Sequence, residues 1–363
     1  MSTISSSDSA NLSLIQTLIT QNRTAYNRLT EEISSGTEYL MRSDDPATTN
    51  RASLVDLDEA QQTQWSTNIK YATNWETSTY SYLDDISDQF SSAVTLATQA
   101  NSTITESSGW TSISSSLSNV VDSILSDSNA SYLGTSLFAG TGTSTDSSTN
   151  TFTKGNASVS GFYTITYNGN DTQRTIKTSS STAASALTTY GTTGNSLFSG
   201  INYTYTDTDS SGNTITYTTP SGTSYNSLEA ISDLQSITNI GTASLSSDQL
   251  SYLQDKYKMV DSSTGTTDTP TITTIVSRIM GVISKGSTQI SNSLATNSAS
   301  SSRMISLKTT VSNAVSTDET QYSDLVGIDT AKAATDLSTM KTVLQASMTL
   351  AGNISSMSLV NYI

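Results

Sequence analysis

Neighbouring carboxylates are the side chains in this sequence whose spacing could support chemistry. Asp44 and Asp45 stand side by side directly before Pro46. Such a pair could share a proton or hold a divalent cation. It equally suits the start of a helix, because aspartate caps the first free N–H groups and proline fits the first helical position. We interpret Asp44, Asp45 and Pro46 as a helix-cap motif and predict no catalytic or metal-binding residue there.

A second acidic stretch, residues 207–213, resembles the start of a calcium-binding EF-hand loop. The acidic residue expected at the twelfth loop position is Thr218, and no helical pattern flanks the stretch. We therefore predict a hairpin turn and no calcium site. Asp84 and Asp85 are adjacent within a helical pattern, so they point in different directions and are expected to be solvated.

The composition removes several classes of active site. The 363 residues contain no cysteine and no histidine, which excludes disulfides, thiolate chemistry and the commonest general base. A net charge of −15 with only 13% charged residues argues against nucleic acid or an anionic membrane as partner. We find no constellation of polar residues that suits an enzyme, and we predict no cofactor. No cleavable signal peptide is recognisable, so export would depend on another targeting signal.

Two segments with heptad spacing, one near each end of the chain, dominate the pattern. Apolar residues recur there at alternating steps of three and four, as in a helix that buries one stripe. Charged residues are absent between Asp8 and Arg23 and again after Lys341, although solvated helices normally carry them. We predict that the two ends pair and that further copies of the chain cover them. The predicted assembly seam consists of Leu12, Ile15, Ile19, Tyr26, Leu29, Ile33, Leu337, Met340, Leu344, Ala351 and Ile354.

Other features of these two segments leave alternatives open. Asn22 interrupts the first stripe, where a polar residue can fix the register. Val343 and Leu350 lie one position before seam residues and are predicted to widen the second stripe. The two segments could instead be unrelated amphipathic helices on a globular core. A membrane span is disfavoured, because polar residues interrupt every run of about eighteen residues.

Longer helical patterns lie between the two terminal segments. Residues 47–108 contain neither glycine nor proline, and Gly109 is predicted to turn the chain into a returning helix. A second long helical pattern begins after Pro270. Gly281 and Gly286 disfavour this second helix by about 1 kcal/mol each relative to alanine.

The middle of the chain changes to strand-like spacing. Asn168-Gly169 is a strong two-residue turn that would join residues 162–167 to residues 172–178 in a hairpin. A second hairpin is predicted from residues 201–207 and 214–219.

These patterns predict a mainly α protein with a β-rich insert. Nested N- and C-terminal helices would form a coiled-coil or helical-bundle rod, and a small β-rich outer domain would lie in the middle of the chain. The predicted domains are a terminal paired-helix domain of residues 1–43 with 325–363, a long-helix rod domain of 46–136 with 226–324, and an outer domain of 137–225.

Several motifs in this layout resemble those of the flagellin-like axial proteins of the bacterial flagellum. The resemblance is greatest to the hook-associated protein 3 family at the hook–filament junction. The matching segments are LTEEISSG at 29–36, SDDPA at 43–47, SLFAGT at 136–141, YNGN at 167–170, RTI at 174–176, GNSLF at 194–198, LQAS at 344–347 and SLVNYI at 358–363. The hairpin at 201–219 and the loop at 261–270 fit the family poorly.

The resemblance implies a structural subunit that assembles with copies of itself into a ring or helical array. It implies export by the flagellar type III apparatus with a dedicated chaperone, and an extracellular location in the flagellum. Hook-associated protein 1 and flagellin would be its neighbours. Flagellin itself is the alternative within the same family, disfavoured by the SDDP and LFAG motifs. A secreted coiled-coil surface protein or adhesin is a second alternative.

Overall fold

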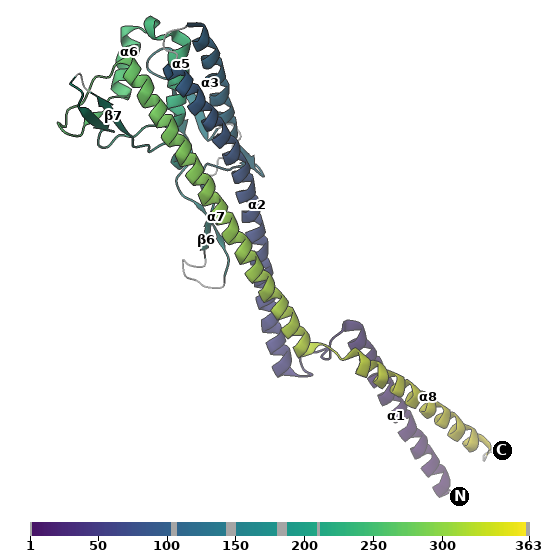
Figure 1. Cartoon of the computed structure of the whole chain (residues 1–363). Helices are drawn as coiled ribbons and strands as arrows, with labels where there is room; N and C mark the ends of the chain where they lie inside the picture. The colour runs from purple at the N-terminus through teal and green to yellow at the C-terminus, as the bar shows by residue number, and fades with distance from the viewer. Residues whose placement is uncertain (1, 103–106, 143–149, 180–186, 209–210, 361–363) are drawn as a thin grey trace. The chain divides into compact units, whose positions relative to one another are not determined.

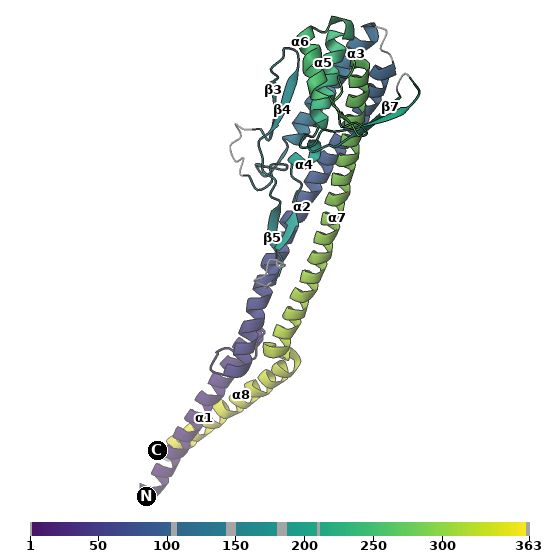
Figure 2. The ribbon, with the colours of Figure 1, turned by 90° about the vertical axis from the view of Figure 1, so that its left-hand side faces the viewer.

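The computed structural model describes residues 2–102, 107–142, 150–179, 187–208 and 211–360 (Figures 1 and 2). Within these ranges, the side chains of 2–9, 11–12, 107–108 and 354–360 are not described. The backbone is mostly helical, and short strands occupy the middle of the chain. The predicted fold class, mainly α with a β-rich insert, is confirmed.

The longest helices lie toward the two ends of the chain and contain about half of its residues. The helices are α1 (Ser2–Ser35), α2 (Pro46–Ser102), α3 (Ser107–Ser128), α4 (Asn195–Phe198), α5 (Ser227–Ile240), the 3₁₀ helix η2 (Thr242–Ser244), α6 (Ser247–Lys256), α7 (Ile272–Val326) and α8 (Thr330–Val360). The strands are β1 (Ser131–Tyr132), β2 (Thr135–Ser136), β3 (Phe152–Asn156), β4 (Tyr163–Tyr167), β5 (Arg174–Lys177), β6 (Leu187–Tyr190), β7 (Thr204–Thr208), β8 (Thr214–Thr218) and β9 (Val260–Asp261).

The chain divides into two compact units. The terminal unit consists of Met1–Gln64 and Thr310–Ile363, and the central unit consists of Trp65–Thr309. Both α2 and α7 contribute residues to each unit, so the division falls within these helices and not at their ends. The three-part division expected from the sequence, with a separate outer domain, stays a prediction.

In the terminal unit, α1 and α8 lie side by side, with the start of α1 and the end of α8 at the same end of the pair (Figures 1 and 2). Gly36 ends α1 with a φ of +72°, a conformation that favours glycine. Its carbonyl accepts a hydrogen bond from the N–H of Ile328 at 3.2 Å. The start of α2 and the end of α7 are joined in the same unit by the amide of Gln62, which donates to Asp318 Oδ2 at 2.8 Å.

In the central unit, α2 and α7 run in opposite directions and face each other along heptad seams (Figure 1). Steps of three and four separate the buried seam residues of α2, and steps of three, four or seven separate those of α7. They are Ile69, Ala72, Glu76, Thr79, Leu83, Ile86, Phe90, Ala93, Ala97 and Ala100 on α2, and Val276, Ile279, Ile283, Gly286, Ile290, Asn297 and Met304 on α7. Hydrogen bonds add to this packing, such as that from Ser277 Oγ to Asn101 Oδ1 at 3.2 Å.

The two glycines of α7 that disfavour a helix lie well inside it. A Cβ atom at Gly281 would collide with the ring of Tyr203, and one at Gly286 would collide with the side chain of Ser227. Their missing side chains let the segment before β7 and the start of α5 approach α7 closely. This close approach accounts for glycine at both positions despite its low helix propensity.

The structure corrects two predictions about turns. Strand β4 pairs with β3, placing Tyr167 opposite Phe152, and β5 pairs with β6, so the hairpin predicted at Asn168-Gly169 is wrong. The rings of Phe152 and Tyr167 lie 5.2 Å apart, and such cross-strand aromatic contacts stabilise this pairing. Gly109 lies inside α3, so it does not make the turn after α2.

The hairpin predicted from residues 201–219 is present as β7 and β8, with Thr204 opposite Thr218. Strand β9 adds a third strand on the far side of β8. Arg278 of α7 anchors this sheet. Its guanidinium lies 5.2 Å from the ring centroid of Tyr205 and 5.1 Å from that of Tyr217. The small sheet is therefore fixed to the long helix by a buried cation–aromatic contact.

Candidate functional site

The predicted seam residues lie on the face where α1 and α8 meet. Where their side chains are described they are half-buried, whereas most positions on the other faces of both helices are exposed. These half-buried residues are Ile15, Ile19, Tyr26, Leu29, Ile33, Leu337, Met340, Leu344 and Ala351. The side chains of Leu12 and Ile354 lie outside the described residues. A role of the seam in assembly stays a prediction.

Apolar side chains on the remaining faces of α1 and α8 are in solvent. Leu14 and Leu18 of α1 are 59% and 45% exposed, and Met348 of α8 is 59% exposed. Val343 and Leu350 are 45% and 51% exposed, so they do not widen the buried stripe as expected from the sequence. One partner helix covers only a narrow stripe, which leaves these side chains available to other molecules.

The terminal unit also has little hydrophobic core. Among its described residues, the buried apolar side chains are Ala52, Val311, Val326 and Ala333, none larger than valine. Its exposed large apolar side chains are Leu14, Leu18, Met41, Leu54, Leu57, Tyr322, Val343, Met348 and Leu350. The central unit, in contrast, buries Trp75, Phe90 and Phe138 completely. Large contiguous patches of exposed apolar side chains are typical of interaction sites on soluble proteins.

The paired carboxylates Asp44 and Asp45 have separate partners. Asp45 Oδ1 accepts the N–H groups of Ala47 at 3.0 Å and Thr48 at 3.1 Å, at the start of α2. Hydrogen bonds from Thr48 lower the pKa of Asp45. Asp44 Oδ2 lies 3.1 Å from the guanidinium of Arg28 and also accepts the N–H of Met41 at 3.0 Å. Both carboxylates are engaged in holding the connection between α1 and α2, and neither is arranged for acid–base chemistry.

A polar layer interrupts the α2–α7 seam of the central unit. Glu76 and Asn297 occupy seam positions and are 1% and 2% exposed. The amide of Asn297 donates to Glu76 Oε2, while the hydroxyl of Ser300 at 2.7 Å and the N–H of Gly191 at 2.9 Å donate to Oε1. Burial raises the pKa of Glu76. A buried polar contact in a helix seam fixes the register at a cost in stability.

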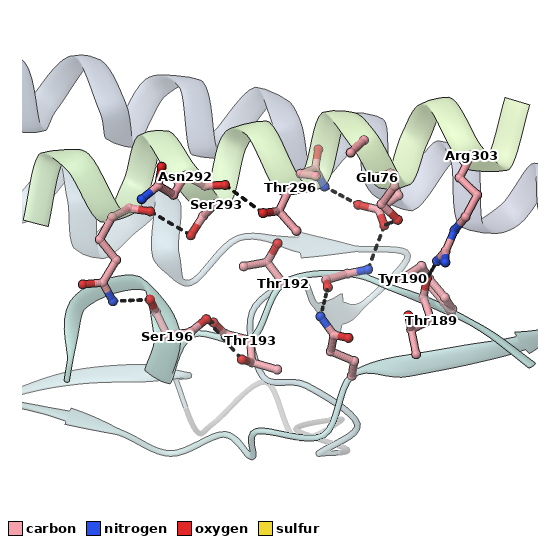
Figure 3. A pocket seen from close by; sticks show the side chains of 16 residues that line it. Glu76, Thr189, Tyr190, Thr192, Thr193, Ser196, Asn292, Ser293, Thr296 and Arg303 are labelled. Atoms are coloured by element: carbon pink, nitrogen blue, oxygen red, sulfur yellow. Dashed lines mark hydrogen bonds between the residues drawn. The ribbon is translucent and has the colours of Figure 1, made fainter. Parts of the chain in front are cut away.

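A cleft of about 530 Å³ opens beside this layer, between α7 and the segment that follows β6 (Figure 3). At one end the guanidinium of Arg303 donates to the carbonyl of Thr189 at 2.7 Å. At the other, the amide of Gln289 donates to the carbonyl of Ser199 at 3.0 Å. Hydroxyl and amide groups make up most of its described lining, so the cleft offers mainly hydrogen-bonding groups.

Sequence reasoning missed Glu76 and Asn297. The signal was present, because Glu76 continues the steps of three and four that run from Ile69 and Ala72 to Thr79 and Leu83. A charged residue at such a position requires a buried partner, and Asn297 holds the corresponding place in the seam of α7.

Nothing in the described part of the chain suggests a metal site or a membrane span. Asp207 and Thr208 of the stretch 207–213 belong to β7, and β8 follows the stretch; Asp209 and Ser210 lie outside the described residues. No group of three or more acidic residues that could hold a metal ion occurs among the described residues. None of the helices, as far as they are described, is long and apolar enough to cross a membrane.

Two family models match the chain. The bacterial flagellin N-terminal helical region matches residues 7–143, and the bacterial flagellin C-terminal helical region matches residues 280–363. Together they cover more than half of the chain, including most of α1 and α7 and all of α2 and α8. Comparison with curated proteins finds no match.

Solved structures with a similar fold include a protein described as a flagellar hook-associated protein of Vibrio parahaemolyticus. It is 15% identical with a TM-score of 0.53, and the match covers 78% of this chain and 100% of that one. FlgL of Xanthomonas campestris is 16% identical with a TM-score of 0.40, covering 80% and 99%. Hook-associated protein 3 of Legionella pneumophila is 15% identical with a TM-score of 0.35, covering 83% and 99%. At such identity the first likeness shows the fold alone, and the lower TM-scores of the other two add no argument.

Proposed function

The chain belongs to the bacterial flagellin family of flagellar structural proteins, and we propose that it is the subunit that joins the hook to the filament. In this proposal, copies of the chain form a ring or a short helical array outside the cell. Hook-associated protein 1 lies on one side of the array and flagellin on the other. A dedicated export chaperone accompanies the chain before assembly.

The observation that carries the proposal is the imbalance in the terminal unit between exposed and buried apolar side chains. Four small apolar residues are buried among its described residues, while leucines of α1, α2 and α8 and Met348 of α8 face solvent. Burying one large apolar side chain contributes about 1.5–3 kcal/mol. Copies of the terminal unit packed around one another would gain this energy at several positions of each chain.

The charge pattern supports the same arrangement. Beyond Lys341 the remainder of α8 carries no charged side chain, and α1 carries none between Asp8 and Arg23. Dense packing of helices against several neighbours is unfavourable for charged groups, because each would lose its hydration. Serine, threonine and asparagine can instead bond to backbone groups or to one another.

Two members of the same family fit these features, a junction subunit and flagellin. The SDDPA segment at 43–47 and the SLFAGT segment at 136–141 favour the junction subunit. Both matching family models describe regions of flagellin, which keeps the filament subunit as the second candidate. The two candidates differ in whether the purified chain polymerises without limit by itself.

Electron microscopy of purified full-length protein can separate them. We expect the protein to add to hooks that end in hook-associated protein 1, to form no long filaments alone, and to permit flagellin to extend the hook. Long filaments of the pure protein would favour the flagellin candidate. Failure to bind either hook or flagellin would contradict both candidates and favour a separate surface protein.

A matched pair of variants ties the result to the terminal helices. Leu350 of α8 and Ile305 of α7 are 51% and 55% exposed, and both lie within long helices. Leu350→Asp places a charge on the proposed assembly surface and should abolish addition to hooks. Ile305→Asp makes the same kind of change in the central unit and should leave addition unchanged. Equal effects of both substitutions would argue against the terminal unit as the assembly surface.

A further inference from the structure

A half-buried lysine and a buried aspartate meet in the central unit. Asp233 of α5 is 0% exposed, and Lys256, the last residue of α6, places Nζ 2.8 Å from its Oδ2. Glu229, one helical turn before Asp233, has Oε2 3.2 Å from the same Nζ. The hydroxyl of Tyr257 donates to Asp233 Oδ2 at 2.7 Å. The fold thus brings together an amine, the carboxyl group that it contacts and a second carboxyl group able to carry a proton.

An ion pair accounts only partly for this arrangement. Among the described residues, Asp233 Oδ1 is buried and has no hydrogen-bond partner. An unpaired oxygen on a buried carboxylate is unfavourable, because its charge is removed from water without compensation. The carbonyl oxygen of a neutral amide would carry no such charge. Burial also raises the pKa of Asp233, because the charged carboxylate loses its hydration.

We propose that Lys256 and Asp233 condense into an isopeptide bond after the chain folds. Lys256 Nζ forms a bond to Cγ of Asp233, and the bond between Cγ and Oδ2 breaks. Glu229 takes a proton from the ammonium group and passes it to Oδ2. The oxygen leaves as water with the two protons that the nitrogen has lost. Ammonium and carboxylate thereby become a secondary amide and water, and no further reactant is required.

The surroundings of the pair suit this condensation. The fold holds the reacting groups in contact, which replaces the low probability of their encounter in water. A small cleft of about 140 Å³, lined in part by Glu229, Lys256 and Tyr257, borders the pair and gives the released water a way out. The chain contains no cysteine, so no disulfide can link α5 covalently to α6.

The nitrogen of Lys256 can attack a carboxyl carbon only after it has lost a proton. Burial lowers the pKa of its ammonium group, but the charges of Asp233 and Glu229 outweigh this effect, and the net pKa is raised. The condensation therefore needs a group that removes a proton from Lys256. Glu229 is the positioned group that accepts this proton, and its removal should slow the condensation without displacing the lysine.

A neighbouring pair serves as an internal control. Lys258 Nζ lies 2.6 Å from Asp255 Oδ1, but these two side chains are 43% and 77% exposed. Water hydrates both groups, so their contact provides no dry site for condensation. The two pairs contain the same functional groups and differ in burial.

Intact-mass spectrometry of folded full-length protein tests the proposal. The mass should be lower than that of the sequence by one water molecule, and proteolysis should give a branched peptide that joins Lys256 to Asp233. Lys256→Arg should restore the full mass, whereas Lys258→Arg should retain the loss. Glu229→Gln should slow the loss of water after refolding of newly made chain by about a hundredfold or more. Circular dichroism establishes that each variant is folded.

Three results would overturn the proposal. The first is a full mass for the folded wild-type chain, which requires no variant to interpret. The second is a loss of water that maps to another site, such as cyclisation of an aspartate elsewhere in the chain. The third is an unchanged rate of water loss in folded Glu229→Gln.

Discussion

Glu76 of α2 accepts a hydrogen bond from the side chain of Asn297 on α7, across a seam that is otherwise mostly apolar. The two residues meet only in one register of these long helices. A slip by one heptad would leave Glu76 buried against apolar side chains, at a cost of about 3–5 kcal/mol for an unpaired buried charge. The layer therefore selects one alignment of two helices whose apolar residues alone would allow several.

Removal of the acceptor should destabilise the central unit more than removal of one donor. Glu76→Ala leaves the amides of Asn297 and Gly191 without their acceptor, and we expect a loss of about 3 kcal/mol in the free energy of unfolding. Ser300→Ala removes one donor and should cost about 1 kcal/mol. Urea unfolding of both variants measures the difference. A similar loss in both would show that the layer contributes no more than one ordinary hydrogen bond.

The same carboxyl group should make stability depend on pH. Burial raises the pKa of Glu76 in the folded state above its ordinary value of 4.5, so the folded chain binds this proton more tightly than the unfolded chain. The stabilisation is complete below the ordinary pKa and is lost as the pH rises through the raised pKa. The free energy of unfolding of the wild type relative to Glu76→Gln should therefore increase as the pH falls from neutral to below 4.5. A difference in unfolding free energy that is constant with pH would contradict a raised pKa of Glu76 in the folded state.

Two glycines provide a test of close packing at α7. Gly286→Ala should destabilise the protein by about 1 kcal/mol or more, because its new Cβ would collide with Ser227. Gly109→Ala in α3 is the matched control, since no atom lies within 4 Å of the position that its Cβ would occupy. In Gly109→Ala the gain in helix propensity should outweigh any steric effect and stabilise the protein by up to about 1 kcal/mol. Thermal unfolding of both variants distinguishes the two effects by sign.

The weak core of the terminal unit should be visible in hydrogen exchange. In the free monomer, backbone amides of α1 and α8 should exchange roughly tenfold or more faster than those of residues 69–100 of α2, because few apolar side chains cover them. Assembly should slow the exchange of α1 and α8. Equal protection of both regions in the free monomer, measured by mass spectrometry, would contradict the proposed role of the exposed side chains.

Aspartate at two positions of α8 should separate pairing within the chain from assembly. Leu344 lies half-buried on the seam, so Leu344→Asp should lower both the helix content of the monomer and its assembly, at a cost of about 2 kcal/mol. Met348 is 59% exposed, so Met348→Asp should leave the helix content unchanged and reduce assembly alone. Circular dichroism and sedimentation measure the two properties. Loss of helix content in Met348→Asp would show that this residue belongs to the intrachain pair.

Local sequence signals predicted the helices and one hairpin. Steps of three and four between apolar residues identified α1, α2, α7 and α8, because a helical face depends only on spacing along the chain. The turn between β7 and β8 was likewise found, since glycine and asparagine mark it between two alternating segments. Such features need no knowledge of distant partners.

Features that depend on distant residues were not predicted. Asn168-Gly169 has the composition of a tight turn, yet β4 pairs with β3 because Tyr167 packs against Phe152. Gly281 was read as a weakness of α7, although the ring of Tyr203 requires it. Asp233 and Lys256 meet through the packing of α5 and α6, which no spacing rule specifies. In each case the deciding partner lies outside the local pattern.

Among the described residues, strand β6 pairs only with β5, which would leave its other edge open to any extended chain that approached it. Arg303 already bonds the carbonyl of Thr189, and Glu76 already bonds the N–H of Gly191, so backbone groups at this edge are occupied. Free strand edges act as templates for irregular aggregation. The long helices thus shield the sheet beside them. A protein whose copies gather at high local concentration is thereby less able to aggregate through this strand edge.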